Sequence, residues 1–233
     1  MKSNVFTHVV ANCILVIAVL VVASVGFWGV TTSVFKTNDN APVYRGSGLN
    51  KVSLMFNVYW GTEYLDDILS IFDKYGFKTT FFVGGSWVAQ YPEVLQKIVE
   101  HGHEVGNHGY YHKEHGKLSY TDNELEINAC GKTVFECVGV DMKLFAPPGG
   151  DFSSDTLNAA KNNGYKTIMW SRDTIDWRDK DSGVIFSRAT KNTDSGELIL
   201  MHPTRHTLAA LDKIISFYVE KGFSVVPVSE NIV

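Results

Sequence analysis

The chain contains few cysteines, and this shortage already limits how the fold can be stabilised. Cysteine occurs three times among 233 residues, at positions 13, 130 and 137. Cys130 and Cys137 lie on one predicted helix, where the helical rise separates them by about 10.5 Å. Because a disulfide needs Cα atoms within roughly 7 Å of each other, we expect no disulfide between them. Both thiols are predicted to be buried as small hydrophobic groups.

Strong net charge and a glycine-rich phosphate loop are also missing. The formal charge is −4, which gives no reason to expect nucleic acid or another polyanion as a partner. No glycine-rich loop follows the first predicted strand, and this disfavours a dinucleotide-binding fold. No internal segment has the composition of an interdomain linker, and no pattern indicates an oligomeric state.

The N-terminal part of the chain carries a long apolar run. Residues 9–30 are interrupted only by Asn12, Ser24 and two glycines, and about 20 apolar residues can cross a bilayer as a helix. A cleavable signal peptide usually has a shorter apolar region and a better cleavage site. We therefore expect an anchor that is retained.

This anchor defines the expected organisation of the chain. Residues 1–36 are predicted to be a short tail and a transmembrane signal-anchor, and residues 37–50 a polar tether. Lys2 favours a cytoplasmic N-terminus. The expected location is the cell membrane, with a single pass and an extracytoplasmic domain over residues 51–233.

From residue 51 onward, short apolar runs alternate with amphipathic segments. The predicted strands are 52–56, 79–83, 104–106, 144–145, 167–170, 198–201 and 224–228, and the predicted helices are 63–75, 92–102, 121–139, 155–164, 184–190 and 207–221. Such alternation predicts parallel strands joined by right-handed crossovers, and continuous apolar runs suit strands that are buried on both faces. The predicted fold is α/β, a distorted (β/α)7 barrel similar to a TIM barrel. An open doubly wound sheet is the alternative.

Polar residues follow several predicted strands, at the edge where such barrels place their active sites. His108 and His112 are four residues apart, and two imidazoles at this spacing can bind one metal ion. The glycine between them lets the backbone turn. Asn57, Asp173 and His202 lie at the ends of other strands and are expected on the same rim.

Five short segments along residues 51–233 then follow one another in a recognisable order. They are Phe56–Gly61, Asn107–His112, Ala146–Gly149, Asp173–Trp177 and Leu200–His202. In this order they resemble the motifs of the polysaccharide deacetylases of the NodB-homology type, carbohydrate esterase family 4. The likeness looks closest to the branch related to sporulation and peptidoglycan deacetylases.

The resemblance implies a metal-dependent hydrolase that removes N-acetyl groups from amino sugars of a cell-wall, peptidoglycan-like glycan. A divalent ion, with zinc as the first candidate, would be held by His108 and His112, with Asn57 as a weak third ligand. Such an ion lowers the pKa of bound water from 15.7 towards about 7. His202 would donate a proton to the leaving amine, and Asp173 would orient its imidazole.

The resemblance also implies walls for the sugar and the acetyl methyl group. The candidate substrate-binding residues are Tyr59, Trp60, Pro148, Trp170 and Trp177. Asp176, which precedes the last of these in the same turn, is expected to be structural.

Two motifs depart from the family pattern. The first motif usually supplies two adjacent aspartates, the base and a metal ligand, where this chain has Asn57 and Val58. An amide cannot accept a proton, although its oxygen can still bind a metal weakly. The family's arginine, which pairs with the base, is replaced by Ala146. The two losses are consistent, because a buried arginine without its carboxylate would be costly.

Three functions remain open after these departures. The first is an active deacetylase in which Asp151, Asp173 or metal-bound hydroxide replaces the usual base, and this is the function we predict from the sequence. The second is a catalytically silent relative that binds glycan at the membrane surface. The third is an amide hydrolase for a small molecule, which an exported, anchored location disfavours.

Overall fold

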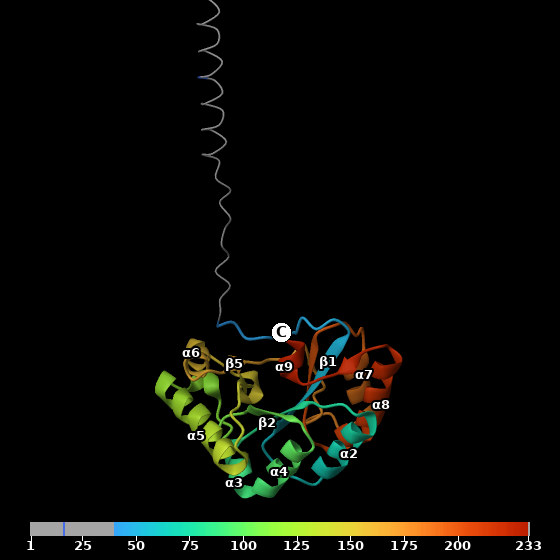
Figure 1. The fold of residues 1–233 in the computed structure, drawn as a ribbon, viewed down its shortest axis with the longest axis horizontal. Coiled ribbons are helices and arrows are strands. Elements are labelled where there is room, and N and C mark those ends of the chain that lie inside the picture. Colours follow the sequence, from blue (N-terminus) through green and yellow to red (C-terminus); the bar gives the residue numbers. More distant parts are fainter. Residues whose placement is uncertain (1–15, 17–39, 233) are drawn as a thin grey trace, which may run out of the picture. The chain divides into compact units, whose positions relative to one another are not determined.

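The computed structural model describes residue 16 and residues 40–232 (Figure 1). The predicted signal-anchor, apart from residue 16, and the first residues of the predicted tether lie outside the described residues. In the part of the chain that is described, no helix is long and apolar enough to cross a membrane. Residues from Asn40 onward belong to one compact unit.

One curled sheet of eight parallel strands forms the centre of this unit, in the order β5–β4–β3–β2–β1–β7–β6, with β8 also paired to β1. The strands are β1 Lys51–Val58, β2 Thr80–Val83, β3 Glu104–Asn107, β4 Leu144–Phe145, β5 Lys166–Thr167, β6 Arg172–Asp173, β7 Glu197–Met201 and β8 Ser224–Val225. β5 and β6 lie at opposite ends of this order, so the sheet is open between them. The α/β class is confirmed, and the predicted barrel is a half-barrel.

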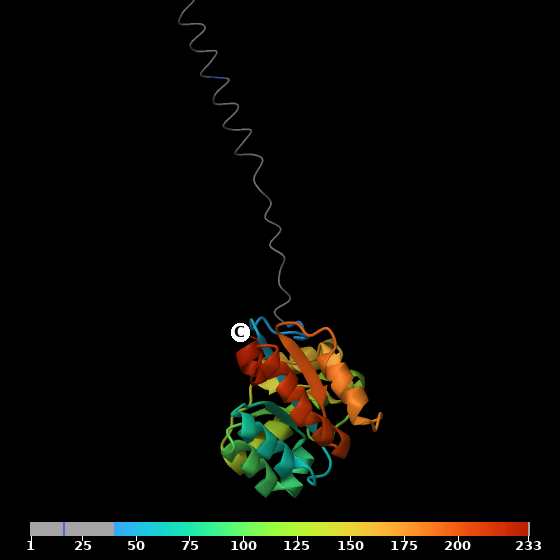
Figure 2. The same ribbon diagram turned by 90° about the vertical axis from the view of Figure 1, so that its right-hand side faces the viewer.

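Helices surround the strands (Figures 1 and 2). They are α2 Leu65–Tyr75, α3 Gly85–Gln90, α4 Pro92–Glu100, α5 Tyr120–Val138, α6 Ser154–Asn162, α7 Ser182–Thr190, α8 Arg205–Glu220 and α9 Val228–Asn231, with 3-10 turns η1 His115–Lys117 and η2 Pro148–Gly150. The six predicted helices are present with ends shifted by a few residues. The sequence missed α3, α9 and β6, because elements this short carry no periodic pattern.

Strand β1 is buried on both faces, as its continuous apolar run predicted. Leu54 and Phe56 belong to the cluster beneath the helices. Met55, one residue out of phase, belongs to a second cluster with Phe82 of β2. Because side chains alternate along a strand, Asn57 shares the face of Met55 and lies on the inside of the curled sheet.

The segment before β1 packs between the end of β5 and the start of β7. Val43 forms a parallel bridge with Ile168, and Arg45 forms an antiparallel bridge with Glu197. Gly46 donates its backbone N–H to the Gly196 carbonyl at 2.7 Å. The predicted tether therefore packs against the domain from Val43 onward, beside the end of β5 and the start of β7.

The cysteine predictions are half right. Cys130 is buried and Cys137 is exposed, and both thiols are free. The prediction that both would be buried was wrong for Cys137. Residues 135–137, in the last turn of α5, are all exposed, although the Cys137 thiol lies 3.7 Å from the Pro92 carbonyl oxygen at the start of α4.

His103, at the start of β3, is enclosed by the core. Its ring makes edge contacts with Phe72 and Phe81, and its Nδ1 accepts the backbone N–H of Thr79 at 3.1 Å. Burial, followed by the nearby charge of Lys78, lowers the pKa of His103 from 6.5 to about 4. The folded protein therefore holds this imidazole neutral at pH values where the unfolded chain protonates it.

We predict that His103→Gln weakens the acid sensitivity of the fold. In the wild type the unfolded state binds a proton that the folded state excludes, so stability is lost as the pH falls from about 6.5 to about 4. This histidine accounts for at most about 3 kcal/mol of that loss. Urea unfolding across this pH window measures the effect. An equally steep loss in the variant would contradict the assignment.

Candidate active site

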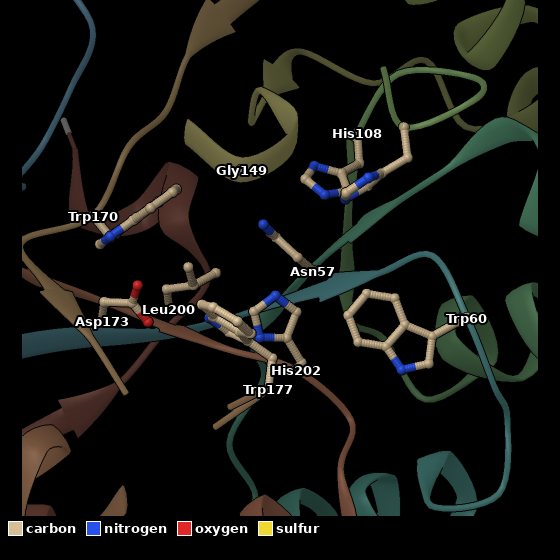
Figure 3. Close-up of a pocket in the computed structure, with 10 residues that line it drawn as sticks. Asn57, Trp60, His108, Gly149, Trp170, Asp173, Trp177, Leu200 and His202 are labelled. Atoms are coloured by element: carbon tan, nitrogen blue, oxygen red, sulfur yellow. The ribbon is translucent and has the colours of Figure 1, made fainter. Parts of the chain in front are cut away.

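A pocket of about 290 Å³ opens where the strands end (Figure 3). It is lined by Asn57, Trp60, His108, His112, Gly149, Trp170, Asp173, Trp177, Leu200 and His202. All of the site residues predicted from the sequence are in this set except Tyr59 and Pro148. Gly149 and Leu200, which the site prediction left out, lie within the recognised motifs.

Asn57 reaches the pocket from the inner face of β1, and Figure 3 shows its amide directed into the pocket. The side chain is 3 % exposed, and its Oδ1 has no hydrogen-bond partner. A buried acceptor without a partner costs about 1–3 kcal/mol. Asn57 therefore places at the base of the pocket a neutral amide whose buried oxygen the protein leaves unsatisfied.

His108 directly follows β3 and is almost completely buried. Its Nδ1 lies 2.7 Å from the Ala146 carbonyl oxygen, so Nδ1 carries the proton and Nε2 keeps its lone pair. Burial, followed by the neighbouring His112, lowers the pKa of His108 well below its usual range. This imidazole is neutral at physiological pH and can act as a metal ligand.

His112 faces His108 across the turn between them. The two ring centroids are 5.1 Å apart, with an angle of 68° between the rings, and burial lowers the pKa of His112 as well. Tyr59 stacks on the His112 ring, with centroids 4.5 Å apart. Tyr59, predicted to be a substrate wall, therefore supports a histidine of the pocket.

His202, just after β7, is held by Asp176. Asp176 Oδ1 accepts a hydrogen bond from Nδ1 of His202 at 2.7 Å. Oδ2 accepts the backbone N–H of His202 at 2.7 Å and the Thr207 hydroxyl at 2.5 Å. Asp176 is thus buried with both oxygens occupied, and it leaves Nε2 of His202 available to the pocket.

The prediction that Asp173 orients His202 is therefore wrong. Asp176, which was expected to be structural, is the residue that holds the imidazole. Asp173 lines the pocket, and its Oδ1 accepts the backbone N–H of Ile175 at 2.8 Å. Ile175 has a φ of +52°, and this turn carries the chain on to Asp176. A positive φ at a β-branched residue could not be read from the sequence.

Tryptophans form the apolar part of the pocket. Trp60 stacks on the His202 ring, with centroids 5.5 Å apart and 18° between the planes. Trp60 and Trp177 are about half exposed, so they stand at the mouth, and Trp170 completes the wall. Pro148 of η2, also predicted to be a wall, is buried and does not line the pocket.

The surroundings of Ala146 and Asp151 explain why the pocket is poor in charge. Ala146 is fully buried in the apolar cluster that contains Met55 and Phe82. Asp151 does not line the pocket, and its Oδ2 accepts the backbone N–H of Gly116 at 2.9 Å. Among the described residues, Asp173 is the one carboxylate in the pocket lining, and no group of three His, Cys, Asp or Glu side chains is placed to share a metal ion.

A curled parallel sheet with two imidazoles and a carboxylate-held histidine at its rim defines the class of NodB-type carbohydrate esterases. Residues 46–168 match the family model described as polysaccharide deacetylase. The chain belongs to this family, carbohydrate esterase family 4, as the motifs predicted.

Two curated relatives illustrate the likeness. The chain is 35 % identical, over 81 % of its length, to the uncharacterized protein YlxY of Bacillus subtilis, of which it spans 60 %. It is 33 % identical, over 72 % of its length, to a peptidoglycan-N-acetylglucosamine deacetylase of Bacillus cereus, of which it spans 81 %.

Solved structures add a second kind of relative. A pseudoenzyme of carbohydrate esterase family 4 from Bacillus anthracis is 36 % identical, with a TM-score of 0.80, covering 82 % of this chain and 69 % of that one. A mutant of that pseudoenzyme with restored enzymatic activity is 34 % identical, with the same TM-score, covering 82 % and 71 %.

The two aspartates of the His202 turn should respond differently to substitution. Asp176→Asn leaves at least one of three buried donors badly paired and should lower the free energy of unfolding by about 1–3 kcal/mol. Asp173→Asn, which changes a partly exposed group, should cost less than about 1 kcal/mol. Thermal or urea unfolding of both variants checks this order, and equal losses would show that Asp176 is not the residue that holds His202.

Proposed function

We propose that this domain binds N-acetylated, peptidoglycan-like glycan in the pocket without removing the acetyl group. The observation that carries the proposal is the neutral, unpartnered amide of Asn57 at the base of a pocket that offers no free carboxylate beside His108 and His112. This reverses the order of the first two functions predicted from the sequence, in which the active deacetylase came first.

Hydrolysis of an acetamide needs a group that accepts a proton from the attacking water within hydrogen-bond reach. Asn57 cannot accept one. Asp176 has both oxygens occupied by donors, and Asp151 is bound to the backbone outside the pocket. Asp173 lines the pocket but lies across it from His108 (Figure 3). The proton-donating half of the reaction, His202 with its aspartate, is retained, whereas the accepting half is missing.

A divalent ion fits the remaining donors. Two neutral imidazoles face each other, and the buried Oδ1 of Asn57 has no other partner. We propose that His108, His112 and Asn57 hold such an ion, with zinc favoured by imidazole ligands. When bound, the ion would polarise the acetamide carbonyl. Without an anionic ligand, this set should bind more weakly than one that contains aspartate.

Aromatic side chains support a glycan as the ligand. Trp60 and Trp177 present about half of their surface at the mouth, where an indole can pack against the apolar face of a sugar ring while polar groups stay hydrated. The names of the relatives also support a cell-wall glycan as ligand and a silent site.

The long apolar run of residues 9–30 supports membrane attachment. In the described part of the chain, residues 43–46 pack beside the end of β5 and the start of β7. We propose that residues 1–36 anchor the chain in the cell membrane with the domain outside.

Acetate release tests the proposal. The purified wild-type chain, supplied with zinc and an N-acetylated glucosamine oligosaccharide, should bind the sugar and release no acetate. Asn57→Asp with Ala146→Arg should release acetate, because a carboxylate then sits beside the ion with a cation to pair it. The arginine overpacks an apolar cluster and should lower the stability by about 1–3 kcal/mol, so Asn57→Asp alone is the companion variant.

Release of acetate by the wild type would contradict the proposal that the site does not remove acetyl groups. Asp173 would then be the base to test, since it is the carboxylate of the pocket lining. Under that second function, Asp173→Asn would abolish the release. If neither the wild type nor Trp177→Ala binds the oligosaccharide, the result would contradict the glycan-binding function.

A further inference from the structure

The turn that carries the two imidazoles has an unusual backbone. Gly109 has a φ of +71° and His112 a φ of +55°. A non-glycine residue with positive φ is uncommon and persists only where the surrounding structure imposes it. The position of His112 opposite His108 therefore depends on groups that restrain residues 109–113 from outside.

A buried carboxylate on α5 supplies the central restraint. Glu126 is 5 % exposed, and its Oε2 accepts the backbone N–H groups of Tyr110 at 3.0 Å and Tyr111 at 2.7 Å. Its Oε1 pairs with Lys113 Nζ at 2.9 Å. Glu126 thus contacts residues on both sides of His112 without touching the pocket.

Tyr59 supports the His112 ring by stacking, but the other hydrogen bonds to the backbone fix the first part of the turn only. Asn107 Oδ1 accepts the backbone N–H of Gly109 at 2.9 Å. The carbonyl oxygens of Gly109 and Tyr110 accept the backbone N–H groups of Gly85 and Ser86, at the start of α3. These bonds end at Tyr110, so Glu126 is the group that extends the backbone restraint to Tyr111, the residue directly before His112.

We propose that Glu126 is a positioning residue that holds the turn in the conformation in which His108 and His112 converge on one ion. The proposal rests on the metal site of the proposed function. Residues that orient metal ligands from behind typically change metal affinity by about 10–100-fold when they are substituted. Glu126→Gln should therefore weaken metal binding by about tenfold, because the neutral amide accepts the two N–H groups less strongly and cannot pair with Lys113.

Glu197 provides a matched control. It is also buried, at 1 % exposure, and it pairs with Arg172 and Arg45. It lies at the start of β7, at the end of the sheet opposite to the pocket. Glu197→Gln should lower the stability through the same kind of loss while leaving the metal affinity unchanged.

Two measurements on the whole chain test whether Glu126 holds the turn that carries His112. Co²⁺ is titrated alone and followed by its visible absorption, and the φ of His112 is measured by NMR scalar couplings in the metal-free protein. We expect Glu126→Gln to bind Co²⁺ about tenfold more weakly and to lose the positive φ at His112, with Glu197→Gln unchanged in both. Wild-type affinity together with a retained positive φ would overturn the proposal, as would an equal loss of affinity in Glu197→Gln.

The two proposals can fail separately. If the wild type binds no Co²⁺, the metal site of the proposed function fails, while the φ of His112 in Glu126→Gln still decides whether Glu126 holds the turn. If Glu126→Gln does not fold, Glu126→Asp serves instead. The shorter side chain keeps the charge but draws back from the backbone N–H groups, so the same loss is expected.

Discussion

Strand β1 is packed on both faces, and the chemistry of the pocket depends on the alternation that this packing imposes. Leu54 and Phe56 belong to the cluster beneath the helices, and Met55 belongs to the inner cluster. With both faces filled, the register of the strand is fixed, because a shift by one residue would exchange the two sets of side chains. Asn57 is thereby held inside the sheet with its Oδ1 unpartnered.

Position 57 carries no charge, and neither does position 146, whose side chain would pair with a charge at position 57. An aspartate at position 57 would be a buried anion, and the residue that should pair with it, Ala146, is enclosed by apolar side chains. A buried charge without a partner is strongly destabilising, whereas a neutral pair is not. Asn57 and Ala146 are therefore compatible with each other in the folded protein. Restoring the aspartate alone or the arginine alone would leave one buried charge without a partner, which is costly. The Ala146 backbone still contributes, because its carbonyl oxygen fixes the tautomer of His108.

Much of the fold followed from the sequence, because long apolar and amphipathic periods decide where buried strands and helices lie. The pocket members Asn57, His108 and His202 were predicted for a related reason, since parallel strands deliver their ends to one rim. The sequence could not show that Asp176, and not Asp173, holds His202, because the position of Asp176 depends on a left-handed turn at Ile175. The open edge between β5 and β6 was also missed, since such short strands leave no pattern.

We propose that the pocket holds an acetylated sugar and leaves its amide bond intact. The most direct measurement is the mass of an N-acetylated oligosaccharide recovered from its complex with the wild-type chain after prolonged incubation with zinc. We predict an unchanged mass, with sugar retained by the protein. Loss of acetyl groups from the recovered sugar would contradict the account.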